Sequence, residues 1–145
     1  MDHLVLLATA TELGVVELSE PQALPHTSAA PALARRYLVA RAAAWPAELH
    51  DVVALLVSEL VTNAVLHGRG PVELRLSDDG DRIRIEISDG DPDPLPPSAG
   101  RPPDGQHSGR GLLIVDSLSD QWGYRPRRTP PGKIVWFELR HRSDR

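Results

Sequence analysis

The sequence contains no cysteine, a single methionine and a single lysine, and only 4% of its 145 residues are aromatic. Without cysteine the chain cannot perform thiol catalysis, bind metals through thiolates or form disulfides, and this absence is typical of a reducing compartment. Its six histidines are scattered without an HExxH pair, and no GxSxG sequence marks the nucleophile elbow of a hydrolase. Redox, zinc and serine-hydrolase chemistry are therefore not expected.

Positive charge is outnumbered by negative charge. Lys and Arg together number 16, Asp and Glu number 20, and the formal net charge is -4. Nucleic acids and anionic membranes attract clustered cations, so this balance disfavours both as partners. A small basic turn contains Arg125, Arg127 and Arg128, and such a turn is more often solvated surface than a docking site. A protein or small-molecule partner is expected instead.

The start of the chain, MDHLVLLATAT, has a short apolar stretch before Ala8-Thr9-Ala10, as a signal peptide does. It lacks the basic residues of a signal peptide, because Asp2 and His3 stand in their place. No other apolar run comes near the roughly 18 residues that span a bilayer. We therefore expect a cytoplasmic protein.

Length and composition are typical of one soluble globular domain, with 145 residues of which 41% are hydrophobic and 25% charged. Residues 1–25 contain a strand-like stretch from Gly14 to Leu18 and two prolines, so we treat them as an N-terminal arm. Residues 26–145 form the expected domain. Residues 90–108, which are rich in proline and lack apolar periodicity, form a loop of the length usual for a lid.

The spacing of apolar residues predicts the elements of this domain. A helix is expected over 29–44, capped by Thr27 or Ser28, and a second from Ala47 to His67, ended by Gly68. Alternation predicts a hairpin with strands near 72–76 and 83–87, and two final strands near 121–125 and 133–140.

A third helix is expected over 110–119, capped by Ser108. Its predicted buried residues are Leu112, Ile114, Val115 and Leu118. Because the strands are apolar on one side only, all three helices should cover one face of the sheet. The predicted fold is a two-layer α/β sandwich with a mixed, mostly antiparallel sheet.

Three polar residues interrupt the very apolar second helix. Glu59, Asn63 and His67 recur at a spacing of four, so they form one polar stripe. The stripe either faces solvent or is covered, and a covered glutamate needs a ligand, a metal or water to offset the cost of burial. Helix geometry alone leaves both alternatives open.

Asp89 follows three alternating isoleucines and shares their strand face, so its carboxylate should point toward the helices at the strand end. It could equally be a turn aspartate, because Asp89-Gly90 is a common turn dipeptide. Farther along, Ser108 to Leu112 places glycines before a helix, where free amides can approach a phosphate. The only lysine, Lys133, is not in a P-loop sequence, and a dinucleotide fingerprint would need glycine at Ile114.

Three segments in this order resemble a known superfamily. SELVTNAVLHG (58–68), DGD (89–91) and SGRGLLIVD (108–116) resemble the N box and the two glycine boxes of GHKL ATPases, which include gyrase and histidine-kinase catalytic domains. More narrowly, ARRYL, SELVTNAV, GRGL, WGY and GKIVWFEL resemble small actinobacterial proteins of the anti-sigma factor serine/threonine kinase family. The resemblance covers residues 33–139.

The resemblance implies a histidine-kinase-like ATPase fold that binds ATP and Mg²⁺. Asn63 would be the protein ligand of Mg²⁺, and Glu59 would act as general base on the attacking hydroxyl. Asp89 would accept a hydrogen bond from the adenine amino group, and His67 would be a further ATP contact. The phosphates would be cradled by Gly109, Arg110, Gly111 and Leu112.

Proteins of this family bind a sigma factor, phosphorylate a serine of a STAS-type anti-anti-sigma partner and form homodimers. The resemblance therefore implies an ATP- and Mg²⁺-dependent anti-sigma factor and protein serine kinase. A histidine-kinase catalytic domain is less favoured, because the residues before the N box contain one convincing helix and not the phosphoacceptor pair.

Two departures from the family pattern favour an alternative. Asp91 and Asp93 replace glycines of the first glycine box, and Lys133 and Ile134 stand where relatives often have threonines that help to fix adenine. The alternative is a protein-binding regulatory module, gated by ATP or free of nucleotide, without kinase activity.

Overall fold

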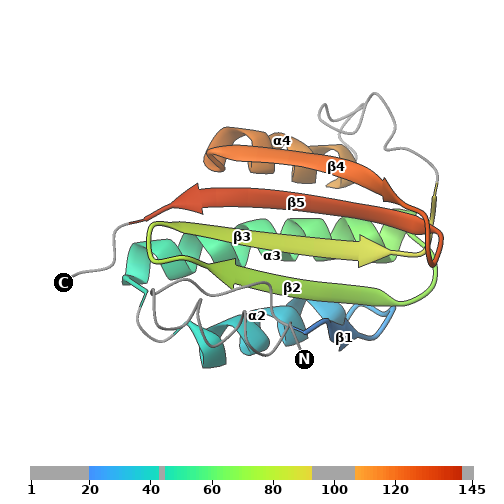
Figure 1. Cartoon of the computed structure of the whole chain (residues 1–145), viewed down its shortest axis with the longest axis horizontal. Coiled ribbons are helices and arrows are strands. Elements are labelled where there is room, and N and C mark those ends of the chain that lie inside the picture. Colours follow the sequence, from blue (N-terminus) through green and yellow to red (C-terminus); the bar gives the residue numbers. More distant parts are fainter. Residues whose placement is uncertain (1–19, 43–44, 93–106, 142–145) are drawn as a thin grey trace, which may run out of the picture.

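The structure, a computed structural model of the chain, describes residues 20–42, 45–92 and 107–141, with only the backbone over 107–111. A five-stranded sheet of order β1-β2-β3-β5-β4 is covered on one face by three helices (Figure 1). This confirms the predicted two-layer α/β sandwich. All strand pairs among the described residues are antiparallel, so the sheet is not mixed.

The strands follow the predicted alternation closely. They are β1 (Gln22–Leu24), β2 (Val72–Asp78), β3 (Arg82–Asp89), β4 (Gln121–Arg127) and β5 (Gly132–Arg140). The predicted hairpin is confirmed as β2 and β3, in which Leu74 pairs with Ile87. β1 lies within the arm and pairs with β2, whereas the strand-like stretch predicted at 14–18 lies outside the described residues.

The first two helices are α2 (Ala30–Arg41) and α3 (Ala47–His67). The bounds of α3 are those predicted, but α2 ends at Arg41 and has no side-chain cap. The Thr27 hydroxyl instead accepts the amide of Ala29, before the helix begins. α2 ends before Ala42, whose carbonyl accepts the amide of Trp45, and the Trp45 side chain is buried in the core instead of continuing the helix surface.

The third helix, α4 (His107–Leu118), begins three residues before the predicted start at residue 110. Ser108 therefore lies inside the helix and does not cap it, and the glycine segment is helical rather than a loop. Packing of Leu112 and Val115 in the core overrides the weak helical propensity of glycine here. The predicted burial of Leu118 is wrong, because this residue is 44% exposed.

The central helix α3 contacts α2, α4 and the strands β2 and β3. By length and composition alone it could cross a membrane, which corrects the expectation that no such run exists. The core helix of a soluble protein passes the same test, and one side of α3 is packed into the interior. Its buried residues are Val53, Leu56, Val57, Leu60, Val61 and Ala64.

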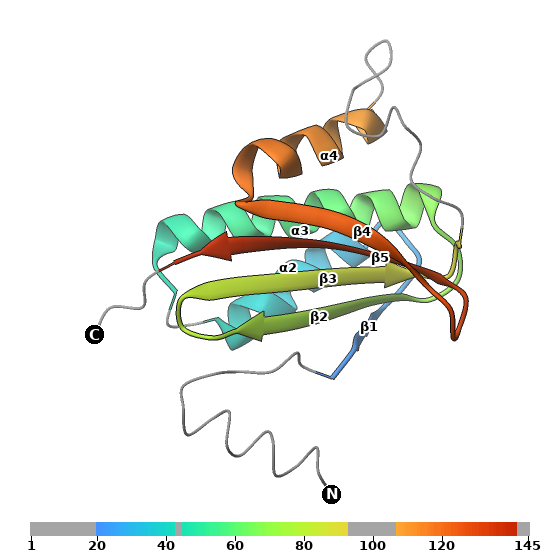
Figure 2. The same cartoon turned by 45° about the horizontal axis from the view of Figure 1, so that its top comes forward.

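Four chain segments meet at one end of the sandwich. The C-terminal end of α3, the end of β3, the start of β5 and the start of α4 lie at the same side in both views (Figures 1 and 2). The residues singled out in the sequence come from these segments. The fold therefore gathers at one end residues that are as far apart in the sequence as Glu59 and Lys133.

Candidate functional site

The polar stripe of α3 is partly covered. Glu59 and Asn63 are half-buried, one helical turn apart, and His67 at the helix end is exposed. Among the described residues, neither the Glu59 nor the Asn63 side chain has a hydrogen-bond or ion-pair partner. The stripe is therefore only partly exposed to solvent, and the described residues do not fulfil the hydrogen-bonding capacity of Glu59 and Asn63. Both side chains are available to a ligand.

Asp89 is the last residue of β3 and is only 2% exposed. Its Oδ1 accepts the amide N–H of Asp91 at 2.8 Å, and the ammonium Nζ of Lys133 lies 3.3 Å from the same oxygen. The bond to Asp91 is the local turn contact anticipated as one alternative. Oδ2 accepts no hydrogen bond from the residues that the structure describes. One oxygen thus shapes the turn while the other is left for a ligand.

Gly68 brings the end of α3 against this carboxylate. A Cβ atom at position 68 would lie 2.6 Å from Cγ and 2.8 Å from Oδ2 of Asp89. The backbone of Gly68 is extended, so glycine is required here by space and not by torsion angle. The Gly90 amide also bonds to the carbonyl of Arg69, which fixes the residues after α3 to the end of β3.

Lys133 was recognised in the sequence only as a departure from the family pattern, but the structure makes it part of the site. It pairs with Asp89 in the β3–β5 register, and its ammonium also lies 3.4 Å from the carbonyl oxygen of Asp91. The side chain is buried, so the ion pair is shielded from water. The one signal in the sequence was that a lone lysine opens an apolar strand.

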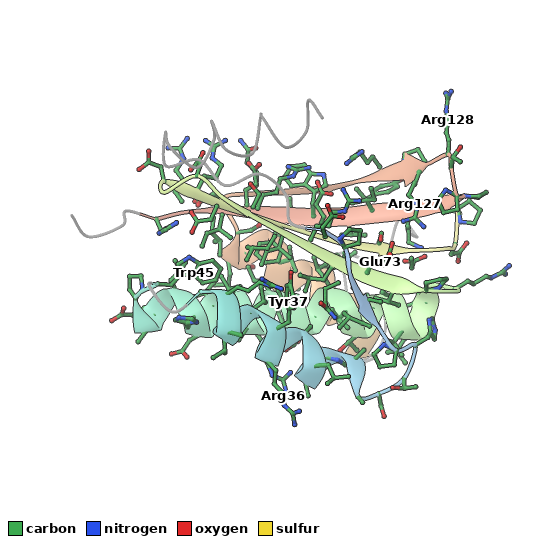
Figure 3. The ribbon with its side chains drawn as sticks, turned by 60° about the horizontal axis from the view of Figure 1, so that its bottom comes forward. Arg36, Tyr37, Trp45, Glu73, Arg127 and Arg128 are labelled. Carbon is green, nitrogen blue, oxygen red and sulfur yellow. The ribbon has the colours of Figure 1, made fainter. Side chains whose placement is uncertain are left out.

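The three arginines of the basic turn make different contacts in the structure. Arg127 donates to the carbonyl oxygens of Pro130 and Asp89 and lies 3.8 Å from the carboxylate of Glu73, whereas Arg128 projects away from the sheet (Figure 3). The exposed Arg125 lies 3.6 Å from the buried carboxylate of Glu86. Arg127 therefore braces the β4–β5 turn against the end of β3.

The predicted phosphate cradle lies in the first turns of α4. Only the first four amides of a helix lack intrahelical partners. Gly109 falls within these positions, whereas the amides of Arg110, Gly111 and Leu112 fall within the hydrogen-bonded helix. The Leu112 side chain is part of the core, so a phosphate would meet the residues before it.

The distance between the two parts of the site follows from helix geometry. Asn63 and Gly68 are five residues apart, which corresponds to about 7.5 Å along the axis. No group of three or more acidic or histidine side chains in the described part of the chain could hold a metal alone. A cation beside Asn63 would therefore need further oxygen ligands from a bound phosphate.

A polar helix stripe, a strand-end carboxylate and a helix start thus meet at one end of the sandwich. This arrangement suits a nucleotide-binding domain. A family model described as the histidine kinase-like ATPase domain matches residues 21–139. The chain belongs to this family. Membership implies ATP binding, and it confirms the resemblance of the sequence to GHKL ATPases.

The chain is similar to two solved structures. The histidine kinase domain of the blue-light activated histidine kinase from Erythrobacter litoralis EL346 is 20% identical; the match covers 95% of this chain and 71% of that chain, with a TM-score of 0.50. A chain of the SiaB-SiaC complex from Pseudomonas aeruginosa is 14% identical; the match covers 97% and 99% of the two chains, with a TM-score of 0.49. No curated protein matches this chain.

Proposed function

We propose that the chain is an ATP- and Mg²⁺-dependent protein serine kinase that also acts as an anti-sigma factor. One observation carries this proposal. Glu59 and Asn63 lie half-buried and without partners among the described residues, one turn apart on the helix whose end touches Asp89. The proposed general base and metal ligand thus come from one helix, and the end of that helix contacts Asp89, the proposed acceptor for the nucleotide base at the end of β3.

Each residue has a distinct role in the proposed reaction. Glu59 accepts the proton of the attacking serine hydroxyl, and Asn63 offers a neutral amide oxygen to the cation. Asp89 accepts a hydrogen bond from the amino group of the base through Oδ2, and the start of α4 at Gly109 and Arg110 binds phosphate oxygens, with His67 as a further contact. Bound Mg²⁺ and ATP supply the transferred phosphoryl group and neutralise the charge that develops on it.

The proposed partners are a sigma factor, which the chain binds, and a STAS-type anti-anti-sigma protein, which supplies the serine. We further propose a homodimer that works in the cytoplasm. The resemblance of ARRYL, SELVTNAV and GKIVWFEL to anti-sigma factor kinases supports these proposals. The net charge of -4 favours a protein partner over nucleic acid or membrane.

A second candidate is a regulatory module that binds ATP, or no nucleotide, without transferring a phosphoryl group. The observation that favours it is the ion pair of Lys133 with Asp89, which engages the carboxylate proposed to recognise the base. The two candidates make opposite predictions for Glu59. Loss of this carboxylate abolishes function in a kinase but leaves a binding module intact.

Calorimetric titration of ATP with and without Mg²⁺ tests the site. We expect saturable binding that requires Mg²⁺ and is weakened at least about tenfold in Asn63→Ala. Thr62→Ala, a change at the neighbouring half-buried residue of α3, should bind as the wild type does. Absence of binding at millimolar ATP in the wild type would disprove nucleotide dependence.

Incubation with STAS-type partners and ATP tests the reaction. The expected product is a phosphoserine on the partner that disappears in Glu59→Gln and persists in Glu48→Gln, a change at an exposed glutamate of the same helix. If Glu59→Gln still binds ATP and still inhibits its sigma factor while no partner is phosphorylated by the wild type, the regulatory module is the correct reading.

A further inference from the structure

Lys133 and Asp89 form a buried donor and acceptor pair where β3 ends and β5 begins. We propose that this pair broadens the base selectivity of the site, so that 6-oxopurine triphosphates bind in addition to ATP. This inference rests on the proposed nucleotide binding. Lys133 is then a residue that determines specificity. Three observations carry the proposal.

The two oxygens of Asp89 are not equivalent. Oδ1 receives the Asp91 amide and the Lys133 ammonium, while Oδ2 receives no donor from the described residues and lies beside Gly68, which itself has no side chain. A ligand must therefore use Oδ2. Because an ionised carboxylate accepts but does not donate, Oδ2 by itself selects a base that presents an N–H.

The Lys133 ammonium lies beside this carboxylate and, as a hydrogen-bond donor, favours a base that presents an acceptor. Of its three N–H donors, the described residues engage two, through Asp89 Oδ1 and the Asp91 carbonyl. These contacts, at 3.3 Å and 3.4 Å, are longer than the roughly 2.7–2.9 Å of a tight charge-assisted hydrogen bond. The ammonium is thus loosely held, and it can turn a donor toward an acceptor on the ligand.

A donor beside an acceptor fits the edge of two kinds of purine. Adenine presents an amino group next to a ring nitrogen acceptor, and hypoxanthine presents a ring N–H next to the O6 acceptor. With a carboxylate alone, O6 would face a second acceptor and be left unpaired, which strongly penalises binding. With Lys133 present, O6 accepts from the ammonium while the ring N–H donates to Oδ2 of Asp89.

The position of the pair explains why the lysine is tolerated in the interior. A buried ammonium needs an anion and further hydrogen bonds, and both are provided by residues 89–91 at the end of β3. Arg127 is the other nearby cation of the described turn, but it bonds to the main-chain oxygen of Asp89 and not to the carboxylate. Of Lys133 and Arg127, only Lys133 therefore contacts the Asp89 carboxylate.

Calorimetric titration with ATP and with inosine 5′-triphosphate, both in excess Mg²⁺, tests the proposal. We expect the wild type to bind the two within about tenfold of each other, and Lys133→Met to favour ATP by a further factor of about ten or more. Lys133→Gln, which keeps a neutral donor, should retain part of the inosine nucleotide binding. Arg128→Met removes an exposed cation from the same turn and should keep the wild-type ratio (Figure 3).

The ratio of the two affinities is the informative quantity, because damage to the fold lowers both affinities together. Wild-type protein that binds ATP but excludes the inosine nucleotide, or an unchanged ratio in Lys133→Met, overturns the inference and leaves the proposed function standing. Wild-type protein that binds neither nucleotide overturns both.

Discussion

The indole N–H of Trp45 donates a 2.8 Å hydrogen bond to Oδ2 of Asp78, joining the connection between α2 and α3 to the end of β2. Oδ1 of the same carboxylate accepts the Gly80 amide at 2.8 Å and lies 3.0 Å from Nε2 of His141. The cluster lies at the end of the sheet opposite Asp89, since β2 ends where β3 begins. It holds the helix layer to the sheet far from the candidate site.

Loss of the indole donor should destabilise this junction. Trp45→Phe leaves Oδ2 of the partly buried Asp78 without that bond, and we expect the free energy of unfolding to fall by about 1–3 kcal/mol. Trp122→Phe removes the same indole group where its bond to Asp116 is exposed, and should cost less. Urea denaturation of both variants measures the difference. Equal costs would mean that the Asp78 bond stabilises the fold no more than the exposed bond to Asp116 does.

Stability in acid should depend on Asp78. Burial by itself would raise the pKa of this carboxyl, but the hydrogen bonds from Trp45, Gly80 and His141, and the charge of His141, bring the pKa below its ordinary value. A lowered folded-state pKa contributes stability that is complete above the unfolded pKa of about 3.9 and is lost as pH falls through the folded value. Asp78→Asn should therefore flatten the loss of stability below about pH 4.

Urea denaturation at a series of pH values from neutral down through the unfolded pKa of an aspartate measures this effect. Asp51→Asn, at an exposed position of α3, is the matched control and should keep the wild-type pH dependence. If Asp78→Asn loses stability in acid as steeply as the wild type, another carboxylate carries the effect.

The close approach of α3 to Asp89 makes Gly68 sensitive to any side chain. In Gly68→Ala the methyl group would meet both the Asp89 carboxylate and the Ala64 carbonyl, so strands and helix must separate. We expect a loss of about 1–3 kcal/mol in the free energy of unfolding and weaker ATP binding. Thermal denaturation and calorimetry check the two effects. Arg69→Ala, at the exposed neighbouring residue, should change neither.

Adjacent leucines of α4 offer a test of how the helix packs. Leu112 is 1% exposed and Leu113 is 41% exposed. Leu112→Ala should cost about 2–5 kcal/mol of unfolding free energy through loss of buried contacts and the cavity left behind. Leu113→Ala should stay within about 1 kcal/mol. Similar costs in urea denaturation would contradict the orientation of α4.

Local patterns were enough to predict most of the framework. The bounds of α3 could be predicted because its apolar residues are continuous and Pro46 and Gly68 stand at its ends. The β2–β3 hairpin could be predicted because a period of two is unambiguous over these residues. α4 was placed less well, since the position of a glycine-containing helix start depends on what the helix packs against and not on propensity.

For the site, the sequence by itself determined that Glu59 and Asn63 share a helix face, because a spacing of four leaves no other outcome once the helix forms. It also determined that Asp89 ends a buried strand. Only the tertiary structure decided that Lys133 stands opposite Asp89 and engages one of its oxygens. Strand register across 44 residues is set by the packing of whole strands, so no local pattern contains it.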